Sequence, residues 1–150
     1  MPTPVSMPRT DFYILAESSS PSRFACSIAN KAWQQGNSVH IAALTREEAA
    51  KMDDLLWTFH DISFLPHALI DDAQAEQTSI TIGWPGATCP DREVLINLTG
   101  EIPDFSKEFD RIVEIVAPEE KQGARERYKR YRDMGFELHS HDMNAEKTNV

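Results

Sequence analysis

The stretch that decides the fold reads Asp11-Phe12-Tyr13-Ile14-Leu15-Ala16, and after Glu17 it continues as Ser18-Ser19-Ser20-Pro21. Its first part is a short apolar run, which is typical of a buried strand. Serine followed by proline is typical of the first turn of a helix, because serine caps free amide groups and proline needs no hydrogen-bond partner there. We therefore predict a strand and then a helix that runs to Gln35 and ends at Gly36-Asn37.

The same alternation of apolar strands and amphipathic helices continues along the chain. Further strands are predicted at 39–44, 79–84, 93–98, 111–116 and 136–139, and helices at 45–57, 103–109 and 118–134. The stretch 59–72 is irregular, but its aromatic and proline content indicates that it packs against another part of the protein. This order of elements predicts an α/β fold with three layers, α/β/α, around a mixed, partly parallel sheet. We expect a Rossmann-like fold without a nucleotide site, since the turn 17–21 contains no glycine and neither a Walker loop nor a dinucleotide fingerprint occurs.

Length and composition predict one domain. The chain has 150 residues, of which 41% are hydrophobic and 26% charged, as in an ordinary globular domain. We expect this domain to span 10–141, with a flexible N-terminal extension at 1–9 and a flexible C-terminal tail at 142–150. No apolar stretch approaches about 20 residues and the first residues lack a secretory pattern, so we expect a cytoplasmic protein without membrane contact. Cys26 and Cys89 make a weak case for a disulfide.

The chain is acidic overall but contains one strongly basic segment. Twenty-four acidic and fifteen basic residues give a net charge of −9, which disfavours binding along the backbone of a nucleic acid. Six of the basic residues nevertheless lie between 121 and 132. A helical period places four cations and one aromatic ring on one face, namely Lys121, Arg125, Tyr128, Lys129 and Arg132.

Two interpretations of this basic face are open. It is either a solvated helix whose basic end complements the helix dipole, or a site for an anion that arginine and lysine bind through charge-assisted hydrogen bonds. A nucleic-acid duplex would bring a long row of phosphates up to an acidic body, whereas a short acidic peptide needs only the local patch. Among anionic ligands we therefore favour a peptide.

A series of motifs, taken in order along the chain, resembles one known family. The motifs are Phe12-Tyr13-Ile14-Leu15, Leu56-Trp57, Ser63-Phe64-Leu65-Pro66-His67, Ile82-Gly83-Trp84-Pro85, Val94-Leu95-Ile96-Asn97-Leu98 and the segment 124–136. Over residues 10–139 the chain resembles the chi subunit of bacterial DNA polymerase III holoenzyme. The resemblance implies a non-catalytic accessory subunit of the clamp-loader complex that acts in DNA replication.

The resemblance also implies two binding surfaces. In that family chi binds the psi subunit on one side and, on the other, the acidic C-terminal tail of single-stranded-DNA-binding protein, so its contact with DNA is indirect. Carried over, the tail-binding positions are Lys121, Arg125, Tyr128 and Lys129, with Val116 in the pocket for the terminal phenylalanine of the tail, and Arg132 lies on the same stripe. The psi-binding surface falls on Trp57, Phe64, Leu65 and Pro66.

Simple energetics predict weak, transient tail binding. Three exposed ion pairs contribute about 0.2–1 kcal/mol each, a buried phenylalanine about 1.5–3, and a carboxylate held by arginine about 1.5–3. The gross sum of about 4–9 kcal/mol, less the cost of ordering a flexible tail, corresponds to micromolar affinity or weaker.

Competing functions have less support in the sequence. His139 and His141 lie two residues apart on a predicted strand, but no third ligand follows at a spacing typical of zinc, so we expect neither metal nor cofactor. Cys26 follows the period of the first helix, which indicates core rather than a nucleophile. The alternative function is direct binding of single-stranded nucleic acid by the basic helix 119–134, with Tyr128 and Tyr131 stacking on bases.

Overall fold

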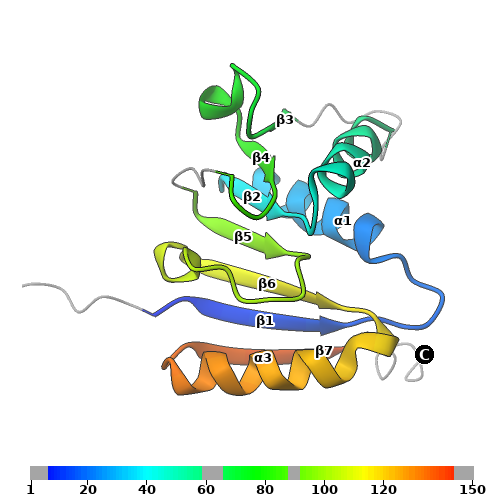
Figure 1. Ribbon diagram of the computed structural model, residues 1–150, viewed down its shortest axis with the longest axis vertical. Coiled ribbons are helices and arrows are strands. Elements are labelled where there is room, and N and C mark those ends of the chain that lie inside the picture. The colour runs from blue at the N-terminus through cyan, green and yellow to red at the C-terminus, as the bar shows by residue number, and fades with distance from the viewer. Residues whose placement is uncertain (1–6, 59–65, 88–91, 144–150) are drawn as a thin grey trace, which may run out of the picture.

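The computed structural model describes residues 7–58, 66–87 and 92–143 (Figure 1). The helices and strands are, in chain order, β1 (Arg9–Ile14), α1 (Pro21–Gln34), β2 (Val39–Ala42), α2 (Arg46–Thr58), β3 (His67–Leu69), β4 (Ile80–Gly83), β5 (Val94–Asn97), β6 (Arg111–Val116), α3 (Lys121–Asp133) and β7 (Glu137–Asp142). Short 3-10 helices lie at η1 (Ala75–Gln77), η2 (Ser106–Glu108) and η3 (Pro118–Glu120). Of the tails expected at 1–9 and 142–150, residues 1–6 and 144–150 lie outside the described residues, as does Cys89, while Arg9 belongs to β1 and Asp142 to β7.

The strands form one sheet in the order β3-β4-β2-β5-β6-β1-β7. Every described pair is parallel, so the predicted α/β class is confirmed and the sheet is more uniform than the mixed sheet we expected. The short helix expected at 103–109 is the single 3-10 turn η2. The irregular stretch 59–72 contains a strand that sequence reasoning missed, β3, which pairs with β4 at the edge of the sheet.

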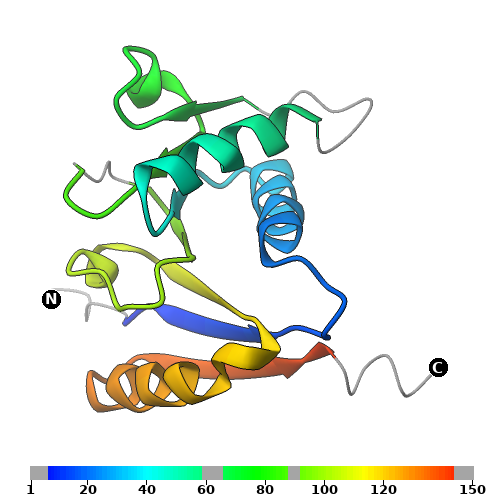
Figure 2. The same ribbon diagram turned by 45° about the vertical axis from the view of Figure 1, so that its right-hand side comes forward.

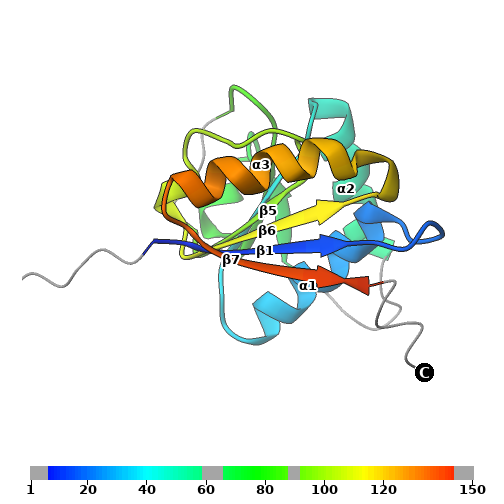
Figure 3. The same ribbon diagram turned by 90° about the horizontal axis from the view of Figure 1, so that it is seen from below.

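Alternating side chains of the central strands build two separate cores. On β6, Val113 and Ile115 point to the face covered by α1 and α2, whereas Ile112 and Val116 point to the face covered by α3. Figure 3 shows α3 on one side of the sheet and α1 on the other. The arrangement is the predicted three-layer α/β/α fold.

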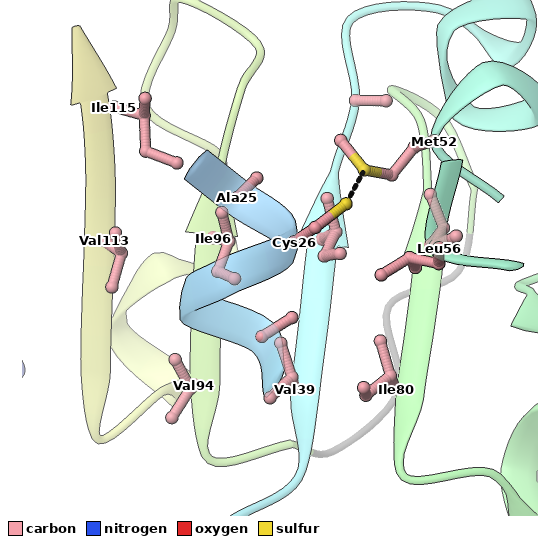
Figure 4. Packing of buried hydrophobic residues seen from close by; sticks show 14 of the residues in the cluster. Ala25, Cys26, Val39, Met52, Leu56, Ile80, Val94, Ile96, Val113 and Ile115 are labelled. Atoms are coloured by element: carbon pink, nitrogen blue, oxygen red, sulfur yellow. Dashed lines mark hydrogen bonds between the residues drawn. The ribbon is translucent and has the colours of Figure 1, made fainter. Parts of the chain in front are cut away.

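The residues at its two ends explain why α1 forms where it does. Ser20 caps the helix by accepting a hydrogen bond from the Arg23 amide (3.3 Å), Pro21 occupies the first turn, and Gly36 takes a φ of 88° just beyond its end. Cys26 packs against Met52 of α2, with 3.7 Å between the two sulfur atoms (Figure 4). Burial raises the pKa of the Cys26 thiol to about 11, as expected for a core residue rather than a nucleophile.

The two faces of the sheet are covered unequally. Helix α3 lies alongside the end of the sheet formed by β6, β1 and β7, while α2 and β3 lie at the opposite end (Figures 1 and 2). Between β5 and β6 the chain has no helix longer than η2, so loops cover the rest of the α3 face.

Within the described ranges, no helix has the length and apolar character that crossing a membrane requires.

Candidate anion-binding groove on helix α3

The helical period sorts the residues of α3 into an inner and an outer set. Ala124, Arg127 and Tyr131 are buried against the sheet, whereas the four cations of the predicted stripe are exposed and its Tyr128 is half-buried. Arg127 therefore does not belong to the solvated basic surface, although the sequence places it among six cations. Tyr131 is fully buried, so the stacking on nucleic-acid bases that we considered for it does not fit the structure.

A buried carboxylate fixes α3 to the sheet. Glu114 of β6, which is 1% exposed, accepts hydrogen bonds from Arg127 Nε (3.1 Å), the Tyr131 hydroxyl (2.7 Å) and Asn97 Nδ2 (2.6 Å). Burial raises the pKa of Glu114, and these three donors oppose that shift by favouring the charged form. Arg127 Nη1 also donates to the Gly100 carbonyl (3.0 Å), which ties the loop after β5 to the same network.

Sequence reasoning missed this network, but the sequence contains a signal for it. Glu114 stands inside the otherwise apolar run Ile112-Val113-Glu114-Ile115-Val116. A charge at the centre of a buried strand requires a partner, and Arg127 and Tyr131 lie off the basic stripe, where they can supply one.

The outer residues of α3 border a groove of about 850 Å³ between the helix and the ends of β1, β6 and β7. All six predicted tail-binding residues line it: Val116, Lys121, Arg125, Tyr128, Lys129 and Arg132. The structure thus brings together the residues that sequence periodicity and the family resemblance had selected.

The floor of the groove is apolar and its rim is cationic. Phe12 and Val116 form part of the floor, and the Tyr128 ring leans on Phe12 with 5.4 Å between centroids. Val116 is fully buried, so it can contribute only to the floor. The acidic side chains that line the groove, Glu126 and Asp142, are outnumbered by four cations.

Three of the rim cations have no salt-bridge partner in the part of the chain that the structure describes. Among the described residues, no acidic oxygen lies within salt-bridge distance of the charged nitrogens of Lys121, Arg125 or Lys129, and all three side chains are exposed. Arg132 reaches Asp133 only at 4.0 Å on the open surface, where such a pair contributes little. The groove therefore offers an anionic ligand several unshared positive charges.

The second predicted surface lies at the far end of the molecule, in the last turn of α2. Trp57 is 55% exposed, and its ring meets His67 of β3 edge-on with centroids 4.7 Å apart. Pro66, directly before β3, is half-buried. Trp57 and Pro66 thus both lie next to the first residue of β3, His67, while Phe64 and Leu65 lie outside the described residues.

The histidines near the C-terminus each contact a carboxylate. His141 Nε2 lies 2.9 Å from Asp11 Oδ1, and His139 Nε2 lies 2.7 Å from Glu137 Oε2. Within the part of the chain that the structure describes, no three His, Cys, Asp or Glu side chains gather as metal ligands.

The fold and the groove define a class of protein: a three-layer α/β protein that presents a cationic groove with an apolar floor on the helix before its last strand. Within this class, the chain belongs to the DNA polymerase III chi subunit family. The sequence profile described as "DNA polymerase III chi subunit, HolC" matches residues 7–139.

Individual proteins agree with this assignment. The chain is 34% identical to DNA polymerase III subunit chi of Pseudomonas aeruginosa over 91% of its length and 98% of that protein. It is 36% identical to subunit chi of Haemophilus influenzae, over 88% and 95% of the two chains, and 34% identical to that of Escherichia coli, over 89% and 97%. The C-terminal domain of the DEAD-box protein Dbp5 superposes with a TM-score of 0.60 at 10% identity, covering 93% and 92% of the two chains. That likeness shows a shared fold.

Proposed function

We propose that this protein is a clamp-loader adaptor that holds the acidic C-terminal tail of single-stranded-DNA-binding protein in the α3 groove and the psi subunit on the Trp57 surface. In this role it has no catalytic site of its own, needs no cofactor, acts in the cytoplasm, and contacts DNA only through its partners. The observation that carries the proposal is the pairing of an apolar floor with cations that have no acidic partner among the described residues.

The groove matches the chemistry of such a tail. A terminal phenylalanine can pack on the apolar floor beside Tyr128, where burial of an aromatic side chain contributes about 1.5–3 kcal/mol. Its carboxylate then lies among exposed cations, of which Arg125 can bind both oxygens. The acidic residues that precede the phenylalanine extend along Lys121 and Lys129, where each exposed pair contributes about 0.2–1 kcal/mol.

The Glu114 network supports this function by fixing the binding residues in position. Arg127 and Tyr131 hold α3 from inside, so the outward residues of the same helix keep a constant spacing above the floor. A receptor whose cations are already in place loses less entropy when it binds a flexible tail.

The Trp57 surface supports the second contact. A tryptophan that is more than half exposed, on the end of α2 away from α3, is suited to a protein partner because aromatic residues dominate binding energies at interfaces. The distance between the two surfaces, at opposite ends of the sheet, allows both partners to bind at once (Figure 1).

Fluorescence anisotropy of a labelled acidic peptide ending in Pro-Phe tests the groove. We expect saturable binding that Lys129→Ala weakens several-fold, while Lys31→Ala, which removes an exposed lysine on α1, leaves the affinity unchanged. Equal loss in both variants would show nonspecific charge attraction and overturn the site. A single-stranded oligonucleotide that binds more tightly than the peptide, with a steep salt dependence, would support the nucleic-acid alternative instead.

Co-elution with the psi subunit in size-exclusion chromatography tests the second surface. We expect Trp57→Ala to abolish or strongly weaken the complex and to leave peptide binding at α3 intact. Unchanged co-elution of that variant would remove Trp57 from the psi interface.

A further inference from the structure

Three carboxylates lie around Trp57 at the end of α2. Asp53 and Asp54 stand four and three residues before Trp57, so the helical period places them on the same side of the helix as its indole. Asp72 follows in the turn after β3, and it is exposed, as is Asp54. Burial raises the pKa of Asp53, and the charges of Asp54 and Asp72 add to that shift while His67 opposes it. The three carboxylates thus repel one another in the free protein.

The two cations of α2 are bound to other acids. Arg46 Nη2 lies 2.7 Å from Asp71 Oδ2, and Lys51 Nζ lies 3.6 Å from Glu48 Oε1. In the part of the chain that the structure describes, no lysine or arginine nitrogen lies within salt-bridge distance of the three carboxylates around Trp57. These carboxylates can therefore accept cations from a partner.

The indole between these carboxylates is held in place from below. The His67 side chain, which is fully buried, meets the Trp57 ring edge-on, and its Nε2 lies 3.2 Å from the carbonyl oxygen of Asp53. Trp57 itself is 55% exposed. A large aromatic surface is thus presented in a fixed position, and a group that is already ordered loses little freedom when a partner covers it.

The two proposed binding surfaces carry opposite charge. Residues 46–76, which include α2 and β3, contain eight acidic and two basic side chains, whereas residues 121–132 of α3 contain six basic side chains and one acidic. The two segments lie at opposite ends of the sheet (Figure 1). An acidic ligand is therefore attracted to α3 and repelled from Trp57, and a basic ligand shows the reverse preference.

We infer that the segment of the psi subunit that docks on Trp57 is basic, with an apolar side chain that covers the indole and neighbouring lysine or arginine side chains that meet Asp54 and Asp72. The inference rests on the proposed role of this surface in psi binding and adds the chemistry of the partner segment. Charges at the border of an interface act mainly on the rate of encounter, whereas a central aromatic residue determines how long the complex lasts. The carboxylates and the indole should therefore affect different rate constants.

Surface plasmon resonance with immobilised psi subunit and the full chain in solution tests this inference. We expect the association rate of wild-type protein to fall about tenfold as salt rises from 50 to 300 mM, because salt screens the attraction between exposed charges. Asp54→Asn with Asp72→Asn should lower the association rate at 50 mM about fivefold, flatten its salt dependence and leave the dissociation rate nearly unchanged. Asparagine at 72 retains the oxygen that accepts a hydrogen bond from the Gln74 amide, so the turn is preserved.

The matched control is Glu101→Gln with Asp104→Asn, which removes two exposed carboxylates from the loop after β5 and so changes the net charge equally. We expect its association rate to stay within about twofold of the wild-type rate. Equal association rates for the two double variants, or association of wild-type protein that does not depend on salt, would overturn the basic segment while leaving psi binding itself in place. Failure of wild-type protein to bind psi at any salt concentration would overturn both the proposed function of the Trp57 surface and this inference.

Discussion

The buried pair Glu114–Arg127 should behave as one energetic unit. Its side chains are 1% and 9% exposed and their closest atoms are 3.1 Å apart. Replacing Glu114 with glutamine leaves the Arg127 guanidinium buried without its counter-charge, and replacing Arg127 with methionine leaves the carboxylate with neutral donors alone. Breaking a buried pair from one side costs about 3–5 kcal/mol, so each single variant should lose that much free energy of unfolding.

The double variant Glu114→Gln, Arg127→Met tests whether the loss of free energy of unfolding in each single variant comes from the interaction between the two charges. Because it removes both charges together, it should be destabilised by about 2–3 kcal/mol less than the sum of the two single variants. Urea unfolding followed by circular dichroism measures all three, and Arg125→Met, an exposed cation on the same helix, should change stability by less than about 0.5 kcal/mol. Additivity of the two single effects would refute the reasoning.

Three further predictions concern other parts of the molecule. Burial lowers the pKa of His40 to about 4, so the stability that its neutral ring contributes is full above about pH 6.5 and is lost as the pH falls through 4. In urea melts, wild-type protein should therefore lose about 2 kcal/mol more unfolding free energy between pH 8 and pH 5 than the His40→Gln variant. An equal loss in the two proteins would contradict this prediction. Burial raises the pKa of the Cys26 thiol to about 11, so in a Cys89→Ser variant it should not react with a thiol reagent at pH 7.5 until urea unfolds the chain. Rapid labelling of the native protein would place Cys26 outside the core. Tail-peptide affinity should fall steadily as salt rises from 50 to 300 mM but not vanish, since the apolar floor is not screened; complete loss would mean that phenylalanine burial contributes nothing.

The strong local signals of the sequence were sufficient for most of the fold. The apolar run before Ser20-Pro21 predicted β1, and Ser20-Pro21 itself predicted the start of α1. Gly135, with a φ of 88°, follows α3 at the position where the helical pattern stops. β3 was missed because its three residues, His67–Leu69, are too few to show an alternating pattern. β7 continues three residues beyond the predicted 136–139, because a polar edge strand needs only backbone pairing with β1 and shows no apolar alternation.

The candidate site was predictable where periodicity alone determines it. The outward stripe of α3 follows from helical spacing, but the separation of Arg127 from the other cations depends on Glu114, a contact between residues that lie thirteen positions apart on different elements. The contact between the His40 ring on β2 and Gly83 of β4 was beyond sequence reasoning for a similar reason, because it depends on these two strands being neighbours.

The central claim, that the α3 groove receives the acidic tail through both its floor and its cations, is tested most directly by calorimetric titration. The titrant is a nine-residue acidic peptide ending in Pro-Phe, compared with the same peptide lacking phenylalanine and with the Arg125→Ala protein. Saturable binding in the micromolar range that is lost in both controls is the predicted result. Equal binding of the two peptides, or full binding by Arg125→Ala, would contradict the account.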